Sequence, residues 1–386
     1  MPRHDFDEII DRRGTDSAKW QAVPEGVLPM WVADTDFSAP KPLLLALEKR
    51  LKHGIFGYAA LQDKDFRLAV AHWMRSRFDW RVEADWVAFS PSVVISLILG
   101  IKAFSNPGDS VLFFSPSYPP FFRIPEQHKR KVLTSSLLPA KQGYLIDFDD
   151  LEEKMARPET RLFMLCNPHN PTGKVFARDE LLRIGKLCLK HGLFVLSDEI
   201  HCDFVFPGKK HLPLPLLSEE LATNCLVTIN PSKTFNIADL HSSAVICPKP
   251  EHLKRFVLER DALALHDSSL GRLALTVAYD ECAWYADQIA AYVMANAAYA
   301  VSFINAHVPG IKAFMPESTF LLWLDCRELG LEQEALQDFF LHKARVLPGN
   351  GTDFGPEGQG FMRLNLGCPR SLLSEALARI QRAVAQ

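Results

Sequence analysis

The stretch Thr228-Ile-Asn-Pro-Ser-Lys-Thr-Phe-Asn236 places Lys233 in a polar turn just after a short apolar run. A lysine at the end of a buried strand loses hydration, which makes its amine available as a nucleophile. Most lysines after strands instead extend to solvent, so this pattern needs support from elsewhere in the chain. Two more turns, Asn167-Pro-His-Asn-Pro-Thr-Gly173 and Ser197-Asp-Glu-Ile-His201, also follow apolar runs. The three turns together predict one site around a reactive lysine.

The bulk composition is that of an ordinary globular enzyme. A chain of 386 residues exceeds the usual size of a single core, so two domains are expected. The formal net charge of −3 gives no reason to expect nucleic acid or an anionic membrane as a partner. The longest apolar stretch, 93–101, is too short to cross a bilayer, and the polar N-terminus has no signal-peptide pattern.

Eight cysteines are scattered along the chain without a C-x-x-C pair. In a chain of this size they are interpreted as reduced core residues in a reducing compartment. We therefore expect a cytoplasmic protein.

Short apolar runs alternate with helical patterns from about residue 85 onward. The expected strands are 86–89, 110–114, 161–166, 193–196, 225–229 and 243–247, and the clearest helices are 92–104 and 178–191. Continuous apolar strands separated by helices indicate an α/β fold with a mostly parallel sheet that is buried on both faces. Ligands bind at the carboxyl ends of such strands, which is where the three turns fall.

The C-terminal part has a different pattern and suggests a second, smaller α/β domain. Helical patterns at about 268–306 precede strands near 319–324 and 361–366 and a final helix from about 371. We expect residues 1–45 to form an N-terminal arm and part of the small domain, 46–280 the large domain, and 281–386 the small domain. The glycine-rich segment 349–360 is predicted to be a loop of about a dozen residues, which is long enough to suggest a function.

The residues at the strand ends suit the chemistry of pyridoxal phosphate. This cofactor needs an amine, which Lys233 supplies, and an acid at the pyridine nitrogen, which Asp198 can supply. Asn170, in its proline-flanked turn, can donate to the ring oxygen or to a substrate carboxylate, His201 can hydrogen-bond the same ring oxygen, and Tyr118 can stack on the ring.

The ends of the cofactor and of the substrate also have candidates. The stretch Ser90-Pro-Ser-Val-Val94 opens an apolar helix whose free amides suit a phosphate, through Val93 and Val94. Arg363 interrupts a strand pattern and can bind a carboxylate with its two-pronged guanidinium.

Each of these residues also has a structural interpretation when it is considered alone. Asp198 can cap a helix or turn, His201 can be a structural histidine, Tyr118 a buried loop tyrosine, and Arg363 an edge-strand salt bridge. The run His201-Cys-Asp lacks the usual spacing of zinc ligands, so no metal is expected. Signatures of dinucleotide, P-loop, zinc-protease and serine-hydrolase sites are absent from the sequence.

With these residues identified, the chain resembles the fold-type I pyridoxal-phosphate enzymes of the aspartate aminotransferase superfamily over nearly its whole length. It is more narrowly similar to the cystathionine β-lyase-like C–S lyases. The resemblance rests on several ordered segments: Phe6-Asp-Glu-Ile-Ile-Asp-Arg-Arg-Gly-Thr-Asp-Ser-Ala-Lys-Trp20, Trp31-Val-Ala-Asp-Thr-Asp-Phe37, Ser197-Asp-Glu-Ile-His201, Pro231-Ser-Lys-Thr-Phe-Asn236 and Arg363-Leu-Asn-Leu-Gly-Cys-Pro-Arg370.

The resemblance implies a fold and a set of roles. The implied fold is a large domain with a mostly parallel seven-stranded sheet between helices, plus a smaller C-terminal α/β domain. Lys233 would bind the cofactor and move the Cα proton, while the backbone at Ala33 would help Arg363 to bind the substrate carboxylate. Tyr58 would reach the phosphate of the partner subunit, which implies a homodimer with shared active sites.

Two positions depart from the aminotransferase pattern. The arginine eight residues after the lysine is His241 here, and the serine three residues before it is Asn230. A neutral histidine binds phosphate less well than arginine, and the missing arginine fits the lyase branch better. His53, His241 and the 349–360 loop are the candidates for lining the distal substrate pocket.

We therefore expect a pyridoxal-phosphate C–S β-lyase that cleaves cystathionine or a related cysteine S-conjugate to a thiol, pyruvate and ammonia. An aminotransferase shares the early steps and is the alternative. A regulatory, partner-binding protein that retains the fold is an alternative of another class.

Overall fold

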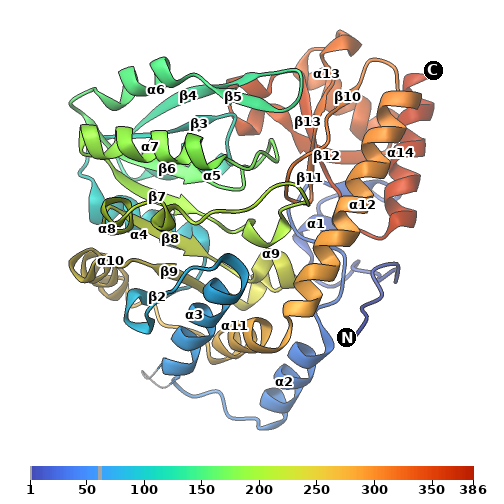
Figure 1. The fold of residues 1–386 in the computed structure, drawn as a ribbon. Helices are drawn as coiled ribbons and strands as arrows, with labels where there is room; N and C mark the ends of the chain where they lie inside the picture. The colour runs from blue at the N-terminus through green and yellow to red at the C-terminus, as the bar shows by residue number, and fades with distance from the viewer. Residues whose placement is uncertain (1, 60–62) are drawn as a thin grey trace.

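The computed structural model describes residues 2–59 and 63–386, and within them the larger of two sheets has eight strands (Figure 1). The strand order is β2-β9-β8-β7-β6-β3-β4-β5, and the central pairs from β8 to β4 are parallel. The strands are β2 (Val87–Ser90), β3 (Ser110–Ser115), β4 (Lys131–Pro139), β5 (Tyr144–Ile146), β6 (Thr160–Cys166), β7 (Phe194–Asp198), β8 (Cys225–Ile229) and β9 (Ser243–Ile246). The mostly parallel sheet is confirmed.

The sheet has one strand more than the seven that were expected. The β4–β5 pair is antiparallel, as are β2–β9 and β8–β9. β5 spans three residues and none of them is fully buried. A strand this short and this exposed carries no continuous apolar run, so its sequence gave no signal.

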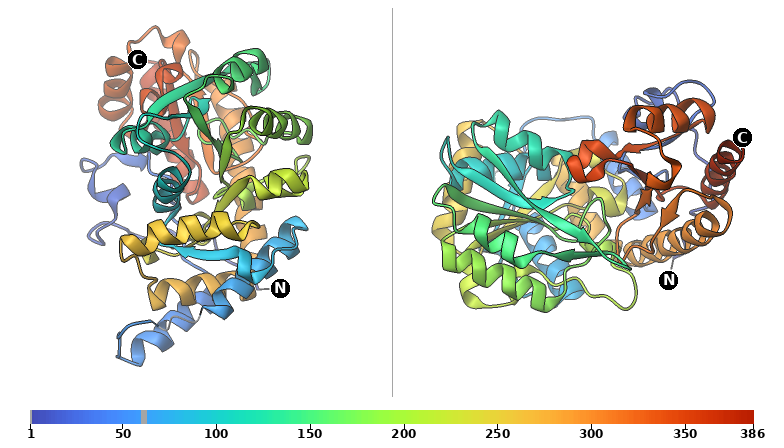
Figure 2. Two further views of the ribbon diagram at one scale, coloured as in Figure 1. Left: turned by 90° about the vertical axis from the view of Figure 1, so that its left-hand side faces the viewer. Right: turned by 90° about the horizontal axis from the view of Figure 1, so that it is seen from above.

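Both faces of the sheet are buried because successive residues of each strand point to opposite sides. In β6, Leu162 and Met164 belong to one apolar cluster, whereas Phe163 and Leu165 belong to another. The first cluster is covered by α4 (Val93–Phe104), α5 (Pro119–Gln127) and α10 (Pro250–Ala262), and the second by α3 (Lys64–Phe78), α7 (Arg178–His191) and α11 (Ser269–Glu281) (Figure 2). The helix predicted at 178–191 is confirmed.

The remaining helices are shorter or lie toward the ends of the chain. They are α1 (Ala18–Gln21), α2 (Lys41–Lys52), α6 (Phe148–Met155), α8 (Glu219–Thr223), α9 (Ser232–Phe235), α12 (Ala283–His307), α13 (Gln333–Asp338) and α14 (Arg370–Val384). Short 3-10 turns include η2 (Cys202–Phe204), η4 (Ala238–Leu240), η7 (Gly351–Phe354) and η8 (Pro356–Gly358).

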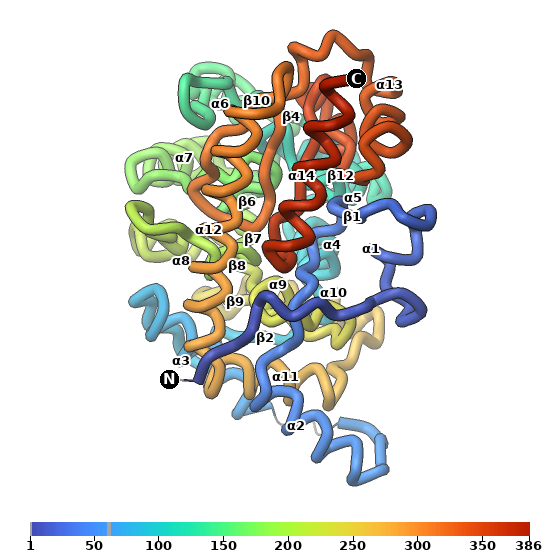
Figure 3. Tube along the Cα trace, turned by 90° about the vertical axis from the view of Figure 1, so that its right-hand side faces the viewer, coloured from blue at the N-terminus to red at the C-terminus, as the bar shows by residue number. Residues whose placement is uncertain are grey.

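The smaller sheet joins the N-terminal arm to the C-terminal part of the chain. Its order is β1-β12-β13-β11-β10, with β1 (Leu28–Met30), β10 (Lys312–Ala313), β11 (Leu321–Asp325), β12 (Val346–Asn350) and β13 (Phe361–Asn365). β1 pairs with β12 in parallel, and Figure 3 shows the two side by side. The domain boundaries at residues 45 and 280 stay predictions.

The helical pattern predicted at 268–306 is two helices, α11 and α12, which break at Cys282. α12 packs along α14 (Figures 1 and 3). By length and composition it can span a membrane, with a mean hydropathy of 1.4, and it is the one such helix in the described part of the chain. A helix that packs in a protein core passes the same test, and α12 buries one face that includes Tyr285, Ile289 and Asn296.

Candidate active site

The three turns converge on one cavity of about 190 Å³ at the carboxyl ends of β6, β7 and β8. The first turn of α4 and the backbone at Ala33 complete its wall. Most of the predicted site residues line this cavity: Ala33, Val93, Val94, Tyr118, Asn170, Asp198, His201 and Lys233. Parallel strands end at the same edge, which is why turns so far apart in the sequence meet here.

Lys233 lies in α9, the short helix that follows β8, and its amine faces the cavity. The Nζ atom donates a hydrogen bond of 2.5 Å to the backbone oxygen of Ala33. Burial lowers the pKa of Lys233 to about 8, against the opposing effect of Asp34. The side chain therefore has the properties of a nucleophilic lysine: a desolvated amine with a depressed pKa.

Asp198 ends β7 and is 2% exposed. Its carboxylate accepts a hydrogen bond of 3.1 Å from the backbone N–H of Ile200. Burial raises the pKa of Asp198 to about 7, although Lys233 acts in the opposite direction. A buried carboxylate without a cation bonded to it is costly, and a protonated ring nitrogen at this position would stabilise its charge.

Three polar side chains surround the same space. Asn170 is buried, and its Oδ1 accepts a hydrogen bond of 3.0 Å from Arg363, which leaves the amide N–H groups to donate elsewhere. Burial, together with the charges of Lys233 and Arg363, lowers the pKa of His201 to about 3, and its Nδ1 atom is buried without a partner in the described chain. Burial raises the pKa of Tyr118 to about 12, so its hydroxyl stays neutral.

Arg363 lies in β13, behind Asn170, with its guanidinium almost completely buried. It donates to Asn170 and, at 2.6 Å, to the backbone oxygen of Trp31, while its Nε atom has no partner in the described chain. Burial lowers the pKa of Arg363 to about 10, so it remains charged at neutral pH. An unpaired buried donor on a charged guanidinium suits a carboxylate ligand.

The 349–360 segment folds over this arginine instead of forming an open loop. The ring of Phe354 stacks 4.7 Å from the Arg363 guanidinium, and the Phe354 carbonyl accepts a hydrogen bond of 2.7 Å from the N–H of Ser117. The segment can turn this tightly because Gly351 lies against the backbone of Gly358, where a Cβ would collide. The sequence indicated a functional segment but gave no signal for Phe354.

The first turn of α4 forms the opposite end of the cavity. The Ser92 hydroxyl caps the helix by accepting from the N–H of Ile95 at 3.2 Å. Val93 and Val94 follow it, and first-turn amides have no partner within a helix. The cavity thus fits pyridoxal phosphate. The Lys233 amine suits its reactive group, the buried carboxylate of Asp198 suits its ring nitrogen, and the first-turn amides suit its phosphate.

Asn230 also lines the cavity, and its Oδ1 accepts from the N–H of Ser232 at 2.7 Å. Other predicted residues lie elsewhere. His241 is exposed after η4 and does not line the cavity, and His53 is exposed at the end of α2. Tyr58 is fully exposed in the single chain and lines a separate surface hollow with His266.

The comparisons with known proteins agree with this geometry. A family model described as aminotransferase class I and II matches residues 33–380. The chain belongs to this family.

Several members of the aminotransferase class I and II family are similar to the chain over its whole length. It is 42% identical to the cystathionine beta-lyase PatB of Bacillus subtilis, with 98% of this chain and 99% of that protein covered. It is 34% identical to the protein MalY of Escherichia coli, with 98% of each covered. The crystal structure of cystalysin from Treponema denticola, which contains a pyridoxal 5'-phosphate cofactor, superposes with a TM-score of 0.96 at 34% identity, covering 100% of this chain and 99% of that one.

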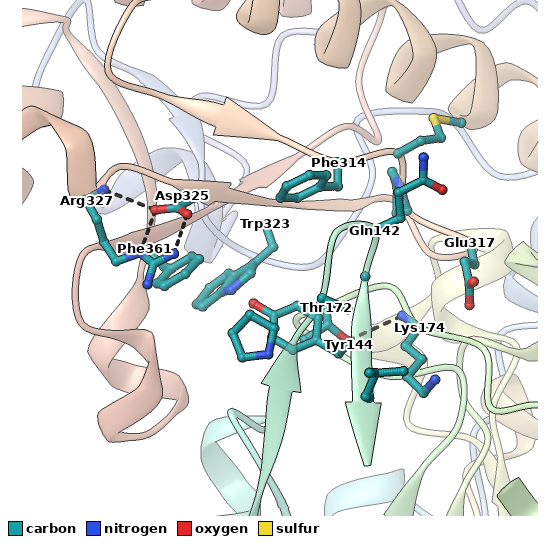
Figure 4. Close-up of a pocket in the computed structure, with 16 residues that line it drawn as sticks. Gln142, Tyr144, Thr172, Lys174, Phe314, Glu317, Trp323, Asp325, Arg327 and Phe361 are labelled. Carbon is teal, nitrogen blue, oxygen red and sulfur yellow. Dashed lines mark hydrogen bonds and ion pairs between the residues drawn. The ribbon is translucent and has the colours of Figure 1, made fainter. Parts of the chain in front are cut away.

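A second cavity in this family member, of about 320 Å³, lies between the β4–β5 hairpin and the smaller sheet (Figure 4). Aromatic side chains such as Tyr144 and Trp323 line it. Its charged groups are already paired, as in Asp325 with Arg327 at 2.7 Å and Lys174 with Glu180 at 2.9 Å. This cavity therefore offers a ligand no free charge, in contrast to the cavity at Lys233.

Sequence reasoning missed a set of buried and partly buried polar side chains beside the candidate catalytic cavity. These residues lie in the segments that carry the family resemblance, but their residue types alone do not indicate a role: Arg12, Lys19, Asp34, Asp36, Asn236 and Asn365. Among the described residues, no group of three or more His, Cys, Asp or Glu side chains is arranged to hold a metal ion. The eight cysteines are all free and buried, which confirms that they are core residues.

Proposed function

We propose that this protein is a pyridoxal-phosphate-dependent C–S β-lyase. Its proposed substrate is cystathionine or a related cysteine S-conjugate, which it cleaves with water to a thiol, pyruvate and ammonia. The observation that carries the proposal is one cavity lined by Lys233 and Asp198, whose wall residue Asn170 accepts a hydrogen bond from Arg363. The relatives named cystathionine beta-lyase support the choice of reaction.

Different residues of the chain would bind different parts of the cofactor. Asp198 would pair with the ring nitrogen of the cofactor, the first-turn amides at Val93 and Val94 would bind its phosphate, and Tyr118 would stack on its ring. The bound cofactor supplies an electron sink that stabilises negative charge at the substrate Cα atom.

The substrate is bound and deprotonated by groups already in place. Arg363 would bind the α-carboxylate with the help of the backbone at Ala33, and Asn170 and His201 would hydrogen-bond near the ring oxygen. Lys233, with a pKa of about 8, can accept the Cα proton and return it at neutral pH. Departure of the thiolate from the β-carbon then completes the elimination.

We infer a cytoplasmic homodimer with shared active sites. Tyr58 sits on an exposed segment beside large apolar side chains that a partner subunit would cover: Leu44, Leu51, Ile55 and Phe56. The free, buried cysteines support a reducing compartment.

The test is release of pyruvate from cystathionine by the purified holoenzyme without added keto acid. Pyruvate and thiol in equal amounts support the lyase. Consumption of an added keto acid without pyruvate release would instead identify an aminotransferase. Lys233→Ala serves as the control, because it should abolish turnover and the cofactor's visible absorption together, whereas a purely partner-binding role would persist.

A further inference from the structure

The segment 31–37, here called the strap, lines one side of the candidate catalytic cavity, and its backbone oxygens accept hydrogen bonds from side chains of β13 and of α9 with its C-cap. Arg363 donates to the oxygen of Trp31. Asn365 donates to the oxygens of Val32 and Asp34, both at 2.6 Å. The Ala33 oxygen between these two accepts from the Lys233 amine. The strap thus connects the candidate carboxylate-binding arginine with the reactive lysine.

The same pattern continues through the second half of the strap. Asn236 donates to the oxygens of Thr35 at 2.8 Å and Phe37 at 2.9 Å. Asn236 is only three residues from Lys233 in the chain, and Asn365 is two residues from Arg363. The position of the strap is therefore fixed relative to both residues at once.

Two cations, Arg12 and Lys19, anchor the strap from outside by binding its own Asp34 and Asp36. Arg12 forms a two-pronged pair with Asp34, at 2.7 and 3.2 Å, and a third bond of 2.7 Å to Asp36. Lys19 is fully buried and bonds Asp36 at 2.6 Å, with Asp34 at 3.6 Å. Although burial raises it, Lys19, Trp20 and Arg12 together hold the pKa of Asp36 below its ordinary value. Charges this deep are tolerated only when they are paired.

These charged side chains fix the position of the strap and also act electrostatically on Lys233. Asp34 follows directly on Ala33, and after burial its charge is the largest influence on the pKa of Lys233, which it raises. Arg363 acts in the opposite direction and Asp198 in the same direction as Asp34, while His201 is uncharged at neutral pH. Arg12 offsets part of the charge of Asp34, so it adjusts how strongly that carboxylate acts.

We propose that Arg12, Lys19, Asp34 and Asp36 are positioning residues for the reaction: they fix the strap, and the Arg12–Asp34 pair sets how tightly the nitrogen of Lys233 holds its proton. The inference rests on the proposed function, because this nitrogen is the one that binds the cofactor. Without the Asp34 anion, the nitrogen of Lys233 should release its proton more easily, whereas without the Arg12 cation it should hold the proton more tightly.

The test is a pH titration of the visible absorption of the bound cofactor, which reports protonation at the nitrogen of Lys233 without any turnover. Asp34→Asn should lower the titration midpoint by about one pH unit, and Arg12→Met should raise it by a similar amount. Asp11→Asn and Arg13→Met remove a neighbouring ion pair of 2.8 Å that is exposed to solvent, and they should leave the midpoint unchanged.

The opposite signs distinguish the electrostatic role from simple loosening of the fold. Shifts in the same direction for Asp34→Asn and Arg12→Met, or no shift beyond the control variants, would overturn the proposal. If Arg12→Met does not fold, Asp34→Asn carries the test alone, because any midpoint that is unchanged or raised contradicts it. A wild-type protein that develops no visible absorption with pyridoxal phosphate would instead refute the proposed function.

Discussion

Replacing Arg363 by methionine tests the carboxylate site most directly. In the structure the guanidinium is held by Asn170 and the Trp31 backbone, and its Nε atom is buried without a partner. A substrate carboxylate would gain charge-assisted hydrogen bonds, each worth about 1.5–3 kcal/mol. Two such bonds correspond to about 3–6 kcal/mol, or a loss of roughly 150-fold to 25,000-fold in kcat/KM. Arg363→Lys keeps the charge but loses the planar fork, so it should recover only part of this loss.

The assay compares two ligands rather than one. The kcat/KM for pyruvate release is measured with a cysteine S-conjugate, and binding of the corresponding amine without a carboxylate is followed through the cofactor absorption. Arg327→Met is the matched control, because Arg327 lies nearby but forms a surface pair of 2.7 Å with Asp325, worth at most about 1 kcal/mol. Equal losses for the ligands with and without the carboxylate would show that Arg363 acts on the fold and not on the substrate.

Two further predictions follow from the buried titrating groups. Burial raises the pKa of Asp198 from 3.8 to about 7, so this group costs the cofactor-free protein stability as the pH rises from about 4 to 7. Cofactor-free Asp198→Asn should therefore resist urea better than the wild type at pH 8, by up to about 4 kcal/mol, and lose that advantage near pH 4; an equal difference at both pH values would contradict this assignment. Because the pKa of Lys233 is lowered to about 8, the rate of cofactor incorporation should rise with pH up to about 8 and then level off. Stopped-flow absorbance measures this rate, and a rise that continues toward pH 10 would mean that the amine is not desolvated.

The sequence was most informative where one residue type and its local context carried the signal. Continuous apolar runs predicted the central parallel strands, and Asp179 and Glu180 at one end with Gly192 beyond the other predicted α7 correctly. The lysine turn predicted a nucleophile only together with the turns at 167–173 and 197–201, because most lysines after strands extend to solvent. The strands β4 and β5 were missed, because β4 is partly exposed and interrupted by Thr134, Ser135 and Ser136, and the three residues of β5 carry no periodicity.

The polar anchors of the strap were beyond such reasoning. Arg12 and Arg13 are adjacent arginines in the same polar segment, yet Arg12 pairs with the buried Asp36 and the partly buried Asp34, while Arg13 pairs on the surface with Asp11. Similarly, nothing about Phe354 in a glycine-rich stretch indicated that it would cover Arg363. The bonds from Arg12 to Asp34 and Asp36 cross 22 and 24 residues of chain, and contacts over such separations leave no local pattern in a single sequence.

The sequence by itself determined the α/β character, the mostly parallel sheet and the set of reactive side chains, because apolar periodicity and turn chemistry are local properties. Only the tertiary structure decided which of these side chains share a cavity and what their environment does to them. Burial lowers the pKa of Lys233 and raises that of Asp198, and burial is created by the packing of two sheets around the strap. The sequence therefore supplies the lysine at position 233, but its reactivity depends on the exclusion of solvent by the fold.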